Sequence, residues 1–142
     1  MTRWQKISLF LLRLSLGWLM FYAGITKVLN PAWSAAGYLT GAKFMTGFFH
    51  WLTTPGILPV VNFLNAWGLT LLGVSLILGV AMRWSCILGI ILMLLYYLPL
   101  GFPYPNAHAL LVDEHIIYSI SLFLLLIFRA GRIWGVGRWL RN

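Results

Sequence analysis

The only two acidic residues of the chain, Asp113 and Glu114, are adjacent, and His115 follows them directly. An apolar run long enough to cross a bilayer begins there, so the three ionisable groups fall at a membrane boundary. Placing charged side chains in that position costs free energy unless they form ion pairs, contact water or take part in the function of the protein. Carboxylates and an imidazole are also common proton-exchanging groups in catalysis. We therefore take this cluster as the candidate catalytic centre.

Composition sets the environment in which that cluster must work. Hydrophobic residues make up 61% of the chain and charged residues 8%, which indicates an integral membrane protein surrounded by lipid. The net charge of +8 would suggest a nucleic-acid partner in a soluble protein. Here the basic residues flank apolar segments, so orientation in the membrane explains them and no nucleic acid is expected. The single cysteine, Cys86, excludes an internal disulfide and is expected to be a small buried apolar residue.

Apolar segments of helical length predict the fold. We expect an all-α, integral membrane four-helix bundle that forms a single transmembrane domain over residues 1–142. The segment between the first two spans is too long for a turn and rich in aromatic residues. It predicts an interfacial or re-entrant helix that covers the outer end of the bundle. The four predicted spans are residues 7–28, 60–80, 84–100 and 110–128.

The basic residues are distributed unequally between the two sides of such a bundle. If the chain crosses four times, only Lys27 and Lys43 lie on one side. This bias predicts that both termini are cytoplasmic, in the cytoplasmic (inner) membrane of a prokaryote. The basic residues on the cytoplasmic side are Arg3, Lys6, Arg13, Arg83, Arg129, Arg132, Arg138 and Arg141.

The first span carries a polar and glycine-lined face. Arg13, Gly17, Met20, Gly24 and Lys27 follow one another at spacings of four and three, so they share one side of a helix. The glycines would let a neighbouring backbone approach closely. Arg13 either extends to the cytoplasmic interface or lines a polar site. Lys27 lies at the outer end, where an ion pair with Asp113 or Glu114 would offset the cost of burial.

Other polar residues are expected at the same outer end. Asn65 lies near the start of the second span, Tyr96 lies near the end of the third, and Tyr118 follows Glu114 by one helical turn. Convergence of polar side chains in an apolar setting is typical of a small-molecule site, although each residue alone also fits an interfacial or packing role. The partial positive charge at a helix N-terminus favours acidic side chains, so one of the two carboxylates is explained as a helix cap. The same effect explains the second carboxylate less well.

Metal and nucleotide chemistry have little support in the sequence. The three histidines, His50, His108 and His115, are not at a ligand-like spacing, so we predict no metal site. No phosphate-binding or dinucleotide fingerprint is present, and no flavin site is predicted.

Several short motifs, in their order along the chain, resemble the DoxX/DoxD family of small four-helix membrane proteins. The most specific are the Asp-Glu-His-x-x-Tyr motif and the Ala-Gly-Arg-x-x-Gly motif, which are similar to those of the DoxD branch. Many relatives carry an acidic residue near the start of the second span, where this chain has Asn65, so no proton relay is expected there. The matching stretches are Leu12–Gly17, Ala23–Lys27, Trp67–Gly73, Asp113–Tyr118 and Arg129–Gly135.

This resemblance implies a membrane redox subunit of the thiosulfate:quinone oxidoreductase type. Quinone would be the substrate, entering laterally between helices, and thiosulfate or another small sulfur compound the electron donor. Lys27 or His115 would hydrogen-bond a quinone carbonyl, and Glu114 or Asp113 would exchange protons with the outer aqueous phase. The sequence encodes no electron carrier, so a partner subunit is expected. Asn65, Tyr96, Tyr118 and Arg13 complete the predicted quinone-binding set.

Two other classes of function remain open at this stage. The first is a non-catalytic scaffold or accessory subunit of a larger respiratory membrane complex, acting with a partner protein or as a homo-oligomer. The second is a small transporter, although four spans are few for that role and no paired broken helices are evident.

Overall fold

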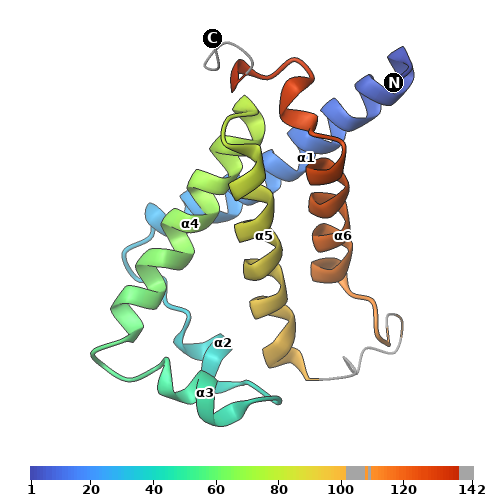
Figure 1. Ribbon diagram of the computed structural model, residues 1–142. Coiled ribbons are helices and arrows are strands. Elements are labelled where there is room, and N and C mark those ends of the chain that lie inside the picture. The colour runs from blue at the N-terminus through green and yellow to red at the C-terminus, as the bar shows by residue number, and fades with distance from the viewer. Residues whose placement is uncertain (102–107, 109, 138–142) are drawn as a thin grey trace.

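The computed structural model describes residues 1–101, 108 and 110–137, and within these ranges it contains helices and no strand. The predicted all-α membrane bundle is confirmed (Figure 1). The helices are α1 (Arg3–Val28), α2 (Ala36–Thr40), α3 (Thr46–Trp51), α4 (Leu58–Leu78), α5 (Met82–Tyr97) and α6 (Glu114–Ile127), with short 3-10 helices η1 (Leu98–Leu100) and η2 (Ala130–Arg132).

Three of the helices are long and apolar enough to cross a membrane: α1, α4, and α5 together with η1. The fourth, α6, has 14 residues. At 1.5 Å per residue it is about 21 Å long, shorter than a hydrocarbon core of about 30 Å. The sequence predicted a helix from residue 110, but α6 starts at Glu114 because the Asp113 side chain caps it. The lower ends of α4 and α5 extend past this charged start (Figure 1).

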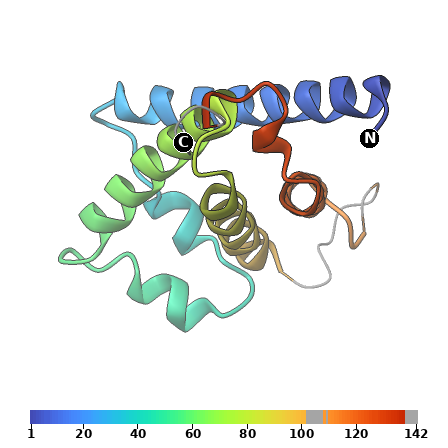
Figure 2. The same ribbon diagram turned by 45° about the horizontal axis from the view of Figure 1, so that its top comes forward.

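Helices α1 and α4 pack with their backbones in close contact. A Cβ atom added at Gly24 would lie 2.3 Å from the backbone nitrogen of Thr70, and one at Gly73 would lie 2.3 Å from that of Phe21. The glycine face predicted for the first span is therefore the surface that contacts α4. The second closely packed pair is α5 with α6. Figure 2 shows α1 along one edge of the molecule, with the ends of α5 and α6 beside each other away from it.

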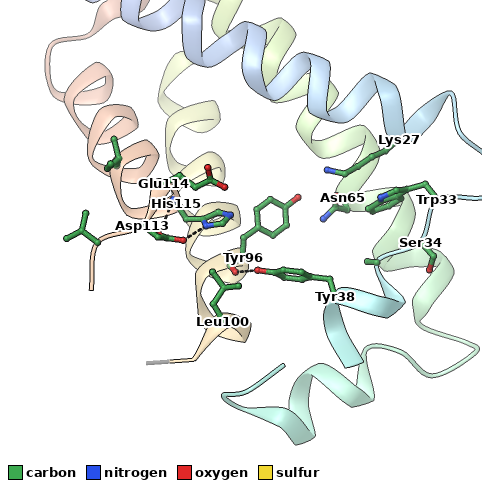
Figure 3. Close-up of a pocket in the computed structure, with 13 residues that line it drawn as sticks. Lys27, Trp33, Ser34, Tyr38, Asn65, Tyr96, Leu100, Asp113, Glu114 and His115 are labelled. Carbon is green, nitrogen blue, oxygen red and sulfur yellow. Dashed lines mark hydrogen bonds and ion pairs between the residues drawn. The ribbon is translucent and has the colours of Figure 1, made fainter. Parts of the chain in front are cut away.

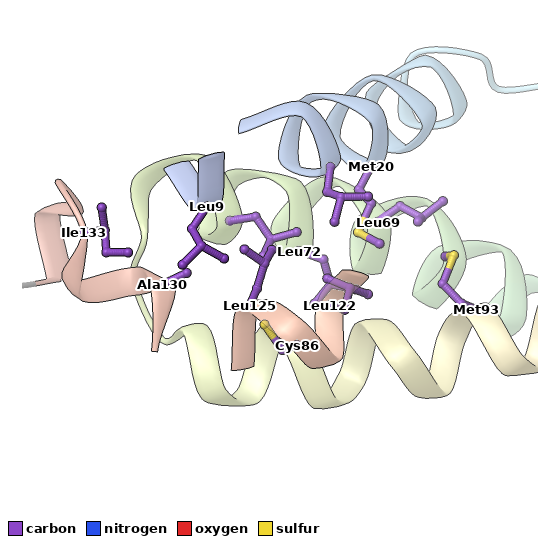
Figure 4. Packing of buried hydrophobic residues seen from close by; sticks show 12 residues of the cluster. Leu9, Met20, Leu69, Leu72, Cys86, Met93, Leu122, Leu125, Ala130 and Ile133 are labelled. Atoms are coloured by element: carbon purple, nitrogen blue, oxygen red, sulfur yellow. The ribbon is translucent and has the colours of Figure 1, made fainter. Parts of the chain in front are cut away.

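The main core joins these two helix pairs. Met20 from α1 meets Leu69 from α4, while Leu122 and Leu125 from α6 pack near Cys86 of α5 (Figure 4). Cys86 is fully buried, as predicted. Helices α4 and α5 are joined by a short connection into a hairpin, and they diverge with distance from that connection. They leave a groove of about 350 Å³ lined by leucine, isoleucine and glycine.

Arg13 lies at the opposite end of the bundle from Lys27. Its guanidinium is fully buried, and Nη1 donates hydrogen bonds to the carbonyls of Ala130, at 2.8 Å, and Ile133, at 2.9 Å. Arg13 therefore has neither of the two predicted roles, extension to the cytoplasmic interface or lining of a polar site. Arg13 fastens the segment after α6 against α1, at the end of the bundle where the N-terminus lies (Figure 1).

Residues 30–57 cover the other end with two short helices rather than one. Phe49 of α3 is 2% exposed and forms a small second core with Ala35, Leu39 and Ala42. This core packs against the start of α4 and against η1, which follows α5. Two hydrogen bonds hold it there: Ala35 N donates to Asn62 Oδ1 at 2.9 Å, and Lys43 N donates to the Pro99 carbonyl at 2.8 Å. The predicted covering segment is thus part of the folded domain.

Candidate functional site

A cavity of about 840 Å³ lies at the end covered by α2 (Figure 3). It brings together six of the eight residues that the sequence singled out, from α1, α4, α5 and α6. These six are Lys27, Asn65, Tyr96, Asp113, Glu114 and His115. The wall is completed by Trp33, Ser34, Ala35, Tyr38, Leu100, Val112 and Ile117.

The acidic cluster is organised by the first turn of α6. Asp113 is the N-cap, and its Oδ1 accepts hydrogen bonds from the backbone nitrogens of His115, at 3.1 Å, and Ile116, at 3.2 Å. Its Oδ2 lies 2.6 Å from His115 Nδ1. Asp113 is 8% exposed, whereas Glu114 is exposed. The interpretation of one carboxylate as a cap is confirmed, and the two acids have different environments.

Lys27 lies across the cavity from this cluster without touching it. Its Nζ is 5.2 Å from the centre of the Trp33 ring, a cation–π contact. Among the described residues, Lys27 forms no ion pair with Asp113 or Glu114, so the direct pair that we predicted is not formed. The ammonium and the Glu114 carboxylate both line the cavity, where each can meet a ligand.

Two buried polar atoms between these groups have no hydrogen-bond partner of normal geometry in the described part of the chain. They are the hydroxyl of Tyr96 and Oδ1 of Asn65. Figure 3 shows the Tyr96 hydroxyl pointing toward Asn65 and Lys27, away from His115. Buried polar groups are nearly always paired, and an unpaired one calls for a water or ligand to satisfy it. The two atoms mark the part of the cavity best suited to a polar ligand atom.

The covering segment supplies cavity residues that the sequence reasoning missed. Trp33 and Ser34 follow α1, and the Tyr38 hydroxyl of α2 donates a hydrogen bond to the Tyr96 carbonyl. The only signal in the sequence was the nearness of Trp33 to Lys27. These aromatic rings give the cavity flat apolar surfaces beside its polar groups.

Tyr118 and Arg13, the remaining two predicted residues, do not line the cavity. Tyr118 packs against the main core although it follows Glu114 by one turn. Arg13 is held at the far end of the bundle. The described residues contain no group of three or more histidine, cysteine or acidic side chains placed to hold a metal ion.

The cavity therefore has two chemically distinct sides. Lys27, Asn65 and the Tyr96 hydroxyl offer hydrogen bonds to an oxygen atom, while His115 and Glu114 can accept or return a proton. Apolar and aromatic surfaces separate the two sides. Such an arrangement can hold a flat, largely apolar molecule that carries oxygen atoms at both ends.

Comparison with known proteins adds one finding to this geometry. No curated protein and no solved structure matches the chain significantly. The DoxX family model matches residues 8–112, a range that contains Lys27, Asn65 and Tyr96 and ends one residue before Asp113. Since the match spans well over half of the sequence, this chain belongs to the DoxX family.

Proposed function

We propose that this protein is a membrane redox subunit that binds a quinone in the cavity between Lys27 and His115. The observation that carries the proposal is the buried Tyr96 hydroxyl, which has no hydrogen bond of normal geometry in the described chain, beside the Lys27 ammonium, which forms no ion pair with a described residue. A quinone carbonyl accepts hydrogen bonds from the Tyr96 hydroxyl and the Lys27 ammonium, whereas Asn65 Oδ1 can only accept a hydrogen bond. Its second oxygen would face His115. The cavity volume lies in the usual range for small-molecule sites.

Reduction of a quinone to a quinol takes up two electrons and two protons. In our proposal, His115 and Glu114 exchange the protons, and Glu114 connects to the aqueous phase because it is exposed. The electrons come from a partner subunit, which oxidises thiosulfate or another small sulfur compound. The charge distribution supports an orientation with both termini in the cytoplasm and this cavity at the outer side of a prokaryotic inner membrane.

The alternative is a non-catalytic scaffold or accessory subunit of a respiratory complex. In a purely structural role, Lys27 would be expected to pair with one of the two carboxylates across the cavity, since pairing offsets the cost of partial burial. The separation of these groups favours a ligand site over a structural ion pair.

Quinone binding to the protein in lipid nanodiscs tests the proposal. The probe is a short-tail ubiquinone, and binding is followed by quenching of tryptophan fluorescence. We expect Lys27→Met to weaken affinity roughly tenfold or more, because a hydrogen bond from a charged donor is lost. Lys6→Met is the matched control, since Lys6 is an exposed lysine on the same helix outside the cavity.

Three outcomes separate the hypotheses. A selective loss in Lys27→Met supports the site. Equal affinity in both variants removes Lys27 from it. Absence of quinone binding by the unsubstituted protein, together with stoichiometric co-purification of other membrane proteins, favours the accessory-subunit alternative.

A further inference from the structure

We infer that Asp113 is a positioning residue, which holds His115 so that its Nε2 is the atom that meets the ligand, and that Asp113 itself transfers no proton. This inference rests on the proposed quinone site, but its first test does not need a quinone. It divides the three-residue cluster into a positioning residue, a ligand-facing imidazole and an exposed acid.

Within the described part of the chain, every hydrogen bond of the Asp113 carboxylate is with the first turn of α6. Oδ1 accepts two backbone hydrogen bonds, from His115 at 3.1 Å and Ile116 at 3.2 Å, while Oδ2 meets His115 Nδ1 at 2.6 Å. The side chain is almost fully buried. A carboxylate fixed by three donors is well placed to orient its neighbour and poorly placed to carry protons to water.

The same contact decides which imidazole nitrogen bears the hydrogen. An ionised carboxylate only accepts hydrogen bonds, so His115 Nδ1 must donate. In the neutral ring, Nε2 is then left with a lone pair. The edge-to-face contact with Tyr96, at 5.7 Å between ring centres, fixes the ring plane further. Figure 3 shows the other side of the ring turned toward Tyr96 and the cavity, away from Asp113.

Glu114 lines the same cavity as Asp113 but differs from it in exposure and contacts. It is exposed, and it has no hydrogen bond or ion pair among the described residues. Carboxylate–imidazole pairs in other sites use the buried acid to set the tautomer and orientation of the ring. By that logic Glu114, and not Asp113, is the acid that exchanges with solvent.

The substitution Asp113→Asn separates positioning from capping. Asparagine is as good an N-cap as aspartate, so the start of α6 is preserved. With its carbonyl oxygen on the backbone nitrogens, its amide NH2 would face His115 Nδ1. That nitrogen would then become an acceptor, and the hydrogen would move to Nε2. The neutral imidazole would present a donor to the cavity in place of an acceptor.

The first test is nitrogen NMR of histidine-labelled protein in nanodiscs at pH 8.5, with the His115 signal assigned by its loss in His115→Gln. We expect the hydrogen on Nδ1 in the unsubstituted protein and on Nε2 in Asp113→Asn. Glu114→Gln, the adjacent acid, is the matched control and should leave the tautomer unchanged. A hydrogen on Nε2 in the unsubstituted protein overturns the inference.

The second test compares affinities for short-tail ubiquinone and ubiquinol under anaerobic conditions at the same pH. An accepting Nε2 favours the quinol hydroxyl, and a donating one favours the quinone carbonyl. We expect Asp113→Asn to shift the quinol-to-quinone affinity ratio roughly tenfold toward quinone, the worth of about one hydrogen bond.

The possible results separate the inference about Asp113 from the proposed quinone-binding function on which it rests. If Asp113→Asn weakens both ligands equally, Asp113 acts through general stability and the inference is overturned. If the unsubstituted protein binds neither ligand, the proposed quinone site fails, and the NMR result alone then decides whether Asp113 sets the tautomer of His115.

Discussion

Two adjacent tyrosines at the end of α5 use their hydroxyl groups in opposite ways. Tyr97 donates a hydrogen bond to the Leu111 carbonyl at 2.8 Å, whereas the buried Tyr96 hydroxyl has no such partner in the described chain. We expect Tyr97→Phe to lower the free energy of unfolding by about 1 kcal/mol, because a carbonyl loses its donor. Tyr96→Phe should leave stability unchanged or higher but weaken quinone binding roughly tenfold. Denaturing-detergent titrations and fluorescence quenching measure the two effects, and a clear loss of stability in Tyr96→Phe would contradict this assignment.

Arg13 is a buried cation without an acidic partner among the described residues. Asp113 and Glu114 lie at the other end, so its charge is stabilised by carbonyl oxygens after α6, including those of Ala130 and Ile133, and by the Phe10 ring, whose centre lies 5.2 Å from the guanidinium carbon. Arg13→Met would leave these carbonyls buried without donors, and we expect a loss of about 3 kcal/mol in the free energy of unfolding. Limited trypsin digestion should then cut sooner after Arg129 or Arg132. Quinone affinity of the folded fraction should not change, and a selective loss of affinity would return Arg13 to the binding site.

At the scale of helices, the contact between α1 and α4 depends on positions where no side chain fits. A methyl group at Gly73 would meet the backbone nitrogen and Cα atom of Phe21 at 2.3 and 2.5 Å, so Gly73→Ala must push the two helices apart. We expect it to cost about 2 kcal/mol, as overpacking does. Gly68→Ala, on the same helix, is the control, because nothing lies within 4 Å of an added Cβ atom there. Thermal melting of the two variants side by side measures the difference, and equal melting temperatures would argue against the close contact.

What the sequence could predict was local to single helices. The four-and-three spacing placed Gly17 and Gly24 on one face, and carboxylates before an apolar run predicted that one of the two acids caps the helix, which the structure shows to be Asp113. The distance between Lys27 and Glu114 could not be predicted, because it depends on how the α1–α4 pair crosses the α5–α6 pair. The hydrogen-bond partners of Arg13 could not be predicted either, because they lie more than a hundred residues further along the chain.

At the scale of the whole molecule, the two ends of the bundle have different tasks. One end holds the N-terminus and Arg13, whose Nη1 donates hydrogen bonds to backbone carbonyls although its Nε has no partner in the described chain. The other end keeps a cavity open under α2, where the Tyr96 hydroxyl and Asn65 Oδ1 have no hydrogen bond of normal geometry with a described residue. The contacts that stabilise the fold thus lie mainly away from the cavity. The cavity can retain unpaired polar groups because the glycine contacts of α1 with α4 and the core of α6 hold the bundle together.

The orientation of these two ends in the membrane can be tested with single cysteines in a Cys86→Ala background. Basic residues cluster at the end with the termini, which predicts that this end faces the cytoplasm. Thr54→Cys, in the exposed connection before α4, should react with a membrane-impermeant maleimide in intact spheroplasts. Val136→Cys, exposed near the C-terminus, should react only after the membrane is permeabilised. The reverse pattern would place the cavity on the cytoplasmic side, and protons taken up or released through Glu114 would then belong to the cytoplasm.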